Sequence, residues 1–187
     1  MNRRPAMPAL RSLRPLPSLL LLACALGAQA APGGHAHDHG IARLDVAIDG
    51  STLSLSLSVP QDNLVGHERV PRNAAERQKL EAAVSGLRQG EALFKPAAAA
   101  GCERIATEVE VATLAPGAAA RAHGDHADVD AELQYRCRDI AALDAIELGL
   151  FAAWPRLQRL EVQAALPGGQ WKRTLKRPER RLVLTAR

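Results

Sequence analysis

Six histidines are the residues of this chain whose type and spacing could do chemistry. Three of them alternate in one short run, His35, His37 and His39, with Asp38 between the last two. Alternate residues of an extended segment share a side, so this run can place three imidazoles around one ion. Neutral imidazole binds divalent transition metals such as zinc, copper and nickel. The spacing therefore predicts a metal-binding arm.

A second group lies within residues 122–128, where His123 and His126 flank Asp125. Gly124 lets this loop wrap around an ion, and short histidine-rich tracts are typical of metal binding. The sixth histidine, His67, stands beside Glu68. The predicted metal ligands are His35, His37, His39, His123 and His126, with Asp38, Asp125 and His67 in second rank.

Alternatives remain open for these histidines. The arm can be a solvated segment without a ligand, and His67 can cap or pack in a connector. The chain lacks zinc-finger spacing, so the pattern does not indicate a preformed structural site. It also lacks the H-E-x-x-H, G-x-S-x-G, P-loop and Rossmann motifs. A zinc enzyme with Glu68 as general base needs rigid ligands, which flexible segments do not supply. We therefore predict no enzymatic activity.

The first thirty residues have the features of a secretory signal peptide. Four arginines precede a short apolar run at residues 19–26, and Ala-Gln-Ala at 28–30 is a cleavage site. The apolar run is too short to span a bilayer, and no later stretch is long enough. We therefore predict a periplasmic protein with no transmembrane segment in the mature chain. The alternative is a lipoprotein anchored at Cys24.

The charge of the chain excludes one class of partner. The formal net charge is +4, from 24 Lys and Arg against 20 Asp and Glu, but residues 1–30 hold four arginines and no acid. The mature part is neutral overall, so the basic footprint that nucleic acid requires is missing. Residues 156–187 are nevertheless basic and residues 103–147 acidic. The alternative function is therefore an envelope protein-interaction domain with incidental histidines.

Export also changes the expectation for the cysteines. Without Cys24, the two that remain are Cys102 and Cys137, and two cysteines in an oxidising compartment favour a disulfide over two separate thiols. Closing a loop of this length stabilises a fold by about 4 kcal/mol in the chain-entropy model. If the apolar faces of their strands match, the two cysteines fall on opposite faces of a regular ladder. The bond then needs a β-bulge, or Cys102 must lie in a loop.

The periodicity of the sequence predicts the elements that position these residues. Apolar residues alternate in 42–48 and again in 53–59, with an Asp49-Gly50 turn that pairs Val46 with Leu53. A helix is predicted from 74 to 88, with Asn73 as N-cap and Glu76 as capping-box partner. Further strands are predicted at 102–113, 128–137, 146–151, 159–166, 170–176 and 182–184.

Together these elements predict an α+β fold, a mainly antiparallel sheet built from hairpins with one amphipathic helix packed on a face. The domain organisation is a signal peptide (1–30), a flexible His-rich arm (31–40) and a single domain (41–187) with a His/Asp loop near 114–127.

Several short segments, in this order, resemble the ZrgA-like periplasmic zinc-uptake proteins. They are His-Asp-His-Gly-Ile-Ala-Arg-Leu-Asp-Val-Ala-Ile-Asp-Gly (37–50), Pro-Gln-Asp-Asn-Leu-Val-Gly (60–66), Gly-Cys (101–102), Ala-Glu-Leu-Gln-Tyr-Arg-Cys (131–137) and Leu-Phe-Ala-Ala-Trp-Pro (150–155). The resemblance implies that the chain binds zinc in the periplasm. It also implies that the chain assists zinc acquisition alongside an ABC-type zinc importer or its binding protein.

Two departures from the family pattern qualify this expectation. Family members often carry a long His/Asp tract in the central loop, which here shrinks to His123-Gly-Asp-His126 and implies a low zinc capacity. The position before Glu68 is often aromatic in the family and is His67 here. The residues alone do not separate zinc from copper or nickel, although both methionines lie in the leader and no Met-rich motif favours copper.

Overall fold

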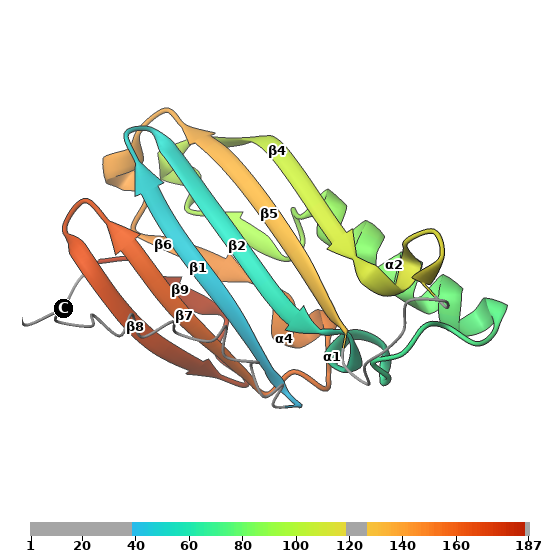
Figure 1. The fold of residues 1–187 in the computed structure, drawn as a ribbon. Helices are drawn as coiled ribbons and strands as arrows, with labels where there is room; N and C mark the ends of the chain where they lie inside the picture. The colour runs from blue at the N-terminus through green and yellow to red at the C-terminus, as the bar shows by residue number, and fades with distance from the viewer. Residues whose placement is uncertain (1–38, 119–126, 186–187) are drawn as a thin grey trace, which may run out of the picture. The chain divides into compact units, whose positions relative to one another are not determined.

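Two β-sheets and one long helix make up the fold, in a computed structural model that describes residues 39–118 and 127–185 (Figure 1). The strands are β1 (Ile41–Asp49), β2 (Thr52–Pro60), β3 (Phe94–Pro96), β4 (Cys102–Val111), β5 (Asp128–Cys137), β6 (Ala145–Leu148), β7 (Arg159–Leu166), β8 (Gly169–Lys176) and β9 (Arg181–Val183). The helices are α1 (Gln61–Val65), α2 (Ala74–Gln89) and α4 (Leu150–Ala153). The described residues belong to one compact unit.

The larger sheet has six strands in the order β4-β5-β2-β1-β7-β8, and the smaller has three in the order β3-β6-β9. This α+β architecture confirms the predicted fold class. One pairing departs from the hairpin scheme, because β7 lies parallel to β1, with Leu44 opposite Val162. The long connection from β2 to β7 carries the helices and the strands β3 to β6, so β7 can return beside β1 in a parallel direction.

The core lies between the inner face of the six-stranded sheet and the layer formed by α2 and the smaller sheet (Figure 1). Alternate residues of β1 and β2 point into it, as the period of two predicts, and Leu44, Leu53 and Leu55 are fully buried. Helix α2 buries the stripe Leu80, Val84 and Leu87. The predicted amphipathic helix on one face of the sheet is therefore confirmed.

The register of the first hairpin differs from the prediction. Leu53 pairs with Ile48 and not with Val46, because the two turn residues are Gly50 and Ser51. Gly50 has a φ of 56°, the positive value that type II′ turns need at their first central position. The predicted pairing was wrong by two residues. A shift of two preserves the face of every side chain, so the apolar faces still agree.

A β-bulge reconciles the disulfide with the apolar faces of β4 and β5. Cys102 is bonded to Cys137, and the register shifts between Arg104 and Ala106. The predicted disulfide is confirmed, and of the two alternatives for it the structure has the β-bulge, with Cys102 inside β4. Ile105 is the extra residue of this bulge and is 49% exposed.

Two further boundaries differ from the sequence prediction. Strand β4 ends at Val111 and gives way to a 3₁₀ turn, Ala112–Leu114. Residues 150 and 151, predicted as the end of a strand, belong to α4 instead. The chain turns at Gly149, where an added Cβ would lie 2.0 Å from the carbonyl oxygen of Ala92. Only glycine fits this close approach, and the strand β6 stops before it.

Helix α2 begins in a charged cap. The side chain of Asn73 accepts a hydrogen bond from the backbone N–H of Glu76 at 2.9 Å, as predicted. The Glu76 carboxylate accepts bonds from the Arg69 guanidinium, at 2.7 and 2.9 Å, and from the backbone N–H of Arg72. The Arg69 bonds, followed by the Arg72 bond, lower the pKa of Glu76 from 4.5 to about 2.

We expect Glu76→Gln to flatten the acid dependence of stability. The folded pKa of Glu76 is depressed, so its contribution is present above the ordinary carboxyl pKa and is lost as the pH falls toward 2. Urea unfolding between about pH 5 and pH 2 measures the slope. Glu81→Gln, an exposed carboxylate on the same helix, is the control. Equal slopes in the two variants would refute the role of Glu76.

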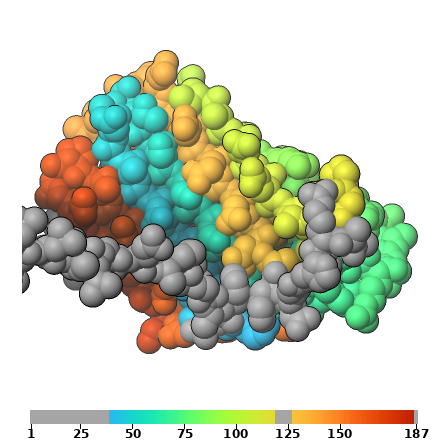
Figure 2. Space-filling view, in the orientation of Figure 1, coloured from blue at the N-terminus to red at the C-terminus, as the bar shows by residue number. Residues whose placement is uncertain are grey.

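The outer face of the six-stranded sheet, drawn in space-filling form in Figure 2, carries acidic cross-strand pairs on β4 and β5 at one side and a basic pair on β7 and β8 at the other. Acidic residues oppose one another across β4 and β5, and basic residues across β7 and β8. The pairs are Glu108 with Glu132, Glu110 with Asp130, and Arg159 with Lys176. Like charges placed opposite each other weaken a sheet slightly, so this arrangement is not one that stability alone favours.

Candidate metal centre

Helix α1 follows β2 directly and begins with three polar residues. Gln61 and Asn63 are fully buried and Asp62 is 6% exposed. A buried polar side chain costs free energy unless it has hydrogen-bond partners. The partners of these three side chains include the base of the histidine-rich arm and one flank of the histidine-rich loop, so α1 is the junction of the candidate site.

Asn63 holds the base of the arm. Its Oδ1 accepts a hydrogen bond from the backbone N–H of Gly40 at 2.7 Å, and its Nδ2 donates to the carbonyl of Ile41 at 2.9 Å. The carbonyl of Gly40 accepts bonds from the backbone N–H groups of Gln158 and Arg159. Gly40 has a φ of 83°, a conformation that favours glycine. Three hydrogen bonds to Gly40 and one to Ile41 therefore fix the chain directly after His39.

Gln61 holds both ends of the loop that carries the second histidine group. Its backbone N–H donates to the carbonyl of Ala127 at 2.8 Å, and its side-chain oxygen accepts a bond from the hydroxyl of Thr113. Its Nε2 donates to the carbonyls of His67 and Arg69. One residue, through its backbone and its side chain, thus links the loop ends with the α1–α2 connection.

Asp62 and Glu68 face His39 from the protein side. The Nδ1 of His39 lies 3.3 Å from Asp62 Oδ2 and 3.6 Å from Glu68 Oε1. The imidazole is 65% exposed, whereas the two carboxylates are 8% and 6% exposed. Arg156 donates to both carboxylate oxygens of Asp62, at 2.9 to 3.2 Å. The imidazole of His39 is therefore accessible to solvent, and two buried carboxylates lie beside its Nδ1.

His67 occupies a different environment. Its side chain is 14% exposed, and its Nδ1 lies 3.2 Å from both Gln61 Nε2 and the carbonyl of Arg69. Its buried Nε2 faces Glu76 Oε2 at 3.8 Å. These contacts place His67 in the packed connection between α1 and α2. The neighbouring side chain that could also bind a metal is Glu76.

The other candidate ligands lie outside the described residues. They are His35, His37, Asp38, His123, Asp125 and His126. Within residues 39–118 and 127–185, no three His, Cys, Asp or Glu side chains form a group that could hold a metal ion. The structure thus brings His39 to two carboxylates and fixes the chain beside both histidine groups, and it does not place a complete ligand set.

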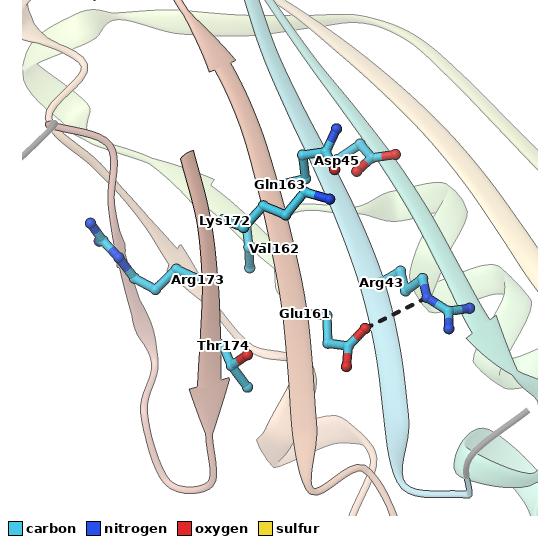
Figure 3. A pocket seen from close by; sticks show the side chains of 8 residues that line it. All are labelled: Arg43, Asp45, Glu161, Val162, Gln163, Lys172, Arg173 and Thr174. Carbon is cyan, nitrogen blue, oxygen red and sulfur yellow. Dashed lines mark ion pairs between the residues drawn. The ribbon is translucent and has the colours of Figure 1, made fainter. Parts of the chain in front are cut away.

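A hollow of about 350 Å³ lies elsewhere, on the outer face of β1, β7 and β8 (Figure 3). Arg43 and Glu161 form an ion pair of 3.6 Å on its floor, and both side chains are about half exposed. Asp45 and Lys172 add one charge of each sign. The mixed charges do not select an ion of one sign, so this hollow is not the candidate site.

Sequence reasoning missed Asp62, Asn63 and Gln61 as site residues. They belong to a segment, 60–66, that the family resemblance included but to which no role was given. The available signal is a proline-led polar triplet directly after a buried strand. Polar residues at such a position need partners, and the partners come from segments far away in the sequence, which only the fold reveals.

We expect Asn63→Ala to lower the free energy of unfolding by about 2 to 3 kcal/mol, because it removes two buried hydrogen bonds and leaves their backbone partners unsatisfied. Asn73→Ala, at the exposed N-cap of α2, is the control and is expected to cost about 1 kcal/mol. Urea unfolding measures both values. An Asn63 variant that loses no more stability than the Asn73 variant would contradict this account of the arm base.

Comparison with known proteins identifies the family. Residues 36–184 match the family model described as ZrgA family zinc uptake protein, and the chain belongs to this family. The resemblance seen in the sequence is thereby confirmed, and the protein is related to zinc uptake. No curated protein matches the chain. Within the described residues, no helix is both long and apolar enough to cross a membrane.

Proposed function

We propose that this protein is a periplasmic zinc-binding protein that assists zinc acquisition or delivery without catalysis. The observation that supports it best is the junction at α1. Gln61 holds the two flanks of the loop, Asn63 holds the base of the arm, and the accessible imidazole of His39 stands beside them. Membership of a zinc-uptake family supports zinc as the bound ion.

The zinc ligands in this proposal are His35, His37, His39, His123 and His126, with Asp38, Asp125 and His67 in second rank. His39 precedes Gly40 and His126 precedes Ala127, and α1 binds both of these following residues. We therefore propose that His39 and His126 contribute to one shared centre. Nitrogen ligands of this kind suit zinc, and the bound ion would pass to an ABC-type importer or its binding protein.

The experiment is elemental analysis of the exported protein after purification from cells grown with zinc, copper and nickel together. The proposal expects zinc as the main metal and little metal in a variant with the five ligand histidines changed to alanine. A protein free of metal, or a variant with the same zinc content, would overturn it. If copper or nickel were the main metal, the metal-binding role would stand and zinc would be the wrong ion.

Zinc binding should weaken steeply below about pH 6, because each imidazole must lose its proton before it binds zinc. Equilibrium dialysis of the exported protein against zinc at pH 7 and pH 5 measures the change. Unchanged binding at pH 5 would contradict ligation by histidine.

The separated charges on the outer sheet face support a second candidate, an envelope protein-interaction domain. Glu108 and Glu132 on one side and Arg159 and Lys176 on the other could meet a partner of complementary charge. This candidate expects no bound metal and full function without the histidines, so the elemental analysis also decides between the two.

A further inference from the structure

The imidazole of His39 has a fixed orientation relative to two acids. Its Nδ1 is the ring nitrogen that faces them, 3.3 Å from Asp62 and 3.6 Å from Glu68. Ionised carboxylates accept hydrogen bonds and do not donate them. A lone pair on Nδ1 would face the lone pairs of both acids, whereas a proton there is attracted to both.

The charge at Asp62 is already matched by a cation. Arg156 donates three hydrogen bonds to its carboxylate, and both oxygens are engaged. A metal ion bound directly to Asp62 would lie beside this guanidinium and be repelled by it. Asp62 therefore fits the role of an orienting group better than that of a ligand.

The backbone beside His39 supports the same arrangement. Asn63, next to Asp62 on α1, holds Gly40 at 2.7 Å, so the residue that follows His39 is attached to the helix that carries the acid. Metal-binding histidines commonly donate their second ring N–H to a carboxylate, which fixes both the tautomer and the direction of the ring.

We propose that Asp62 and Glu68 hold His39 with its proton on Nδ1, that Arg156 fixes the Asp62 carboxylate in place, and that Nε2 of His39 is the nitrogen that binds zinc. Asp62, Glu68 and Arg156 are thus positioning residues of the zinc centre. This inference rests on the proposed zinc-binding function. It adds which nitrogen of His39 binds zinc and which residues orient the imidazole.

The test uses long-range ¹H–¹⁵N correlation spectra of the exported, ¹⁵N-labelled protein without zinc, at a pH where the imidazoles are neutral. These spectra distinguish a proton on Nδ1 from one on Nε2, and comparison with His39→Ala assigns the signals. The proposal expects the Nδ1–H form of His39, with Nε2 shifting when zinc is added. The Nε2–H form in the zinc-free protein, or zinc on Nδ1, would overturn it.

Variants separate orientation from folding. Asp62→Asn should shift the His39 tautomer toward Nε2–H and weaken zinc binding by about 10- to 100-fold. Arg156→Gln, which changes an exposed side chain and leaves the buried acid in place, should shift both quantities in the same direction by less. Asp45→Asn, an exposed acid on the outer sheet face, is the control and should change neither. An unchanged tautomer in both Asp62→Asn and Arg156→Gln would overturn the proposal.

The two failures remain distinguishable. If calorimetry detects no zinc binding by the unmodified protein, the proposed function fails, and the assignment of a zinc-binding nitrogen fails with it. If zinc binds but the His39 tautomer does not depend on Asp62, the function stands and the positioning role is refuted.

Discussion

Changing His126 to alanine is expected to weaken zinc binding at the proposed centre with His39 by about 100-fold or more. The reason is the shared anchor, because Gln61 binds the residue after His126 and Asn63 binds the residue after His39. Loss of an outer partner of a metal ligand already costs about 10- to 100-fold in affinity, and a lost ligand costs at least as much. His39→Ala should have an effect of similar size on the same site.

Zinc titration of both single variants and the double variant measures this coupling. In a shared centre, the first substitution removes most of the affinity, so the second adds less than its effect alone. Asp45→Asn, an exposed acid on the outer sheet face, is the comparison and should leave zinc binding unchanged. If each single variant kept one undisturbed tight zinc, the arm and the loop would be independent sites and the shared centre would be wrong.

Changing Cys102 and Cys137 together to serine is expected to lower the free energy of unfolding by about 4 kcal/mol. The bond ties β4, an edge strand, to β5 at the start of their pairing, and it closes a loop between residues 35 apart in sequence. In a domain of this size the loss corresponds to a fall in Tm of roughly 10 °C.

Reduction supplies the control for this prediction. The native protein unfolded in the presence of a thiol reductant should match the double-serine variant, and that variant should not respond to the reductant. The prediction would fail if the reduced native protein unfolded at the same urea concentration as the oxidised one.

Local patterns in the sequence were sufficient for most of the fold. The alternation of Leu53 and Leu55 with serines specified a strand with one buried face, and the spacing of Leu80, Val84 and Leu87 specified the helix. These patterns indicate which side chains are buried, and in the structure those side chains lie in the core. They do not report partners, so the parallel pairing of β1 with β7 was not predictable from either strand.

Errors arose where the deciding feature was small or distant. The hairpin register depended on whether Gly50 is the second or the first residue of the turn, which the Asp-Gly signal does not decide. Helix α1 has five residues, too few for a periodicity to emerge. Ile105 is exposed because it is the extra residue of a bulge between β4 and β5, which the local period of the strand does not reveal.

The candidate site divides in the same way. Histidine spacing in the sequence selected His39 as a ligand, and the structure sets two carboxylates beside it. Asp62 was not predicted, because its role depends on the approach of Gly40 and Arg156 to α1. Such contacts between distant segments leave no local pattern of residues.

The most direct test of the central claim is zinc titration calorimetry on the exported protein, beside a variant with His35, His37, His39, His123 and His126 changed to alanine. The account predicts zinc binding with a Kd in the micromolar range or tighter for the native protein and no such binding by the variant. Equal heats from the two proteins, or no binding by either, would contradict it.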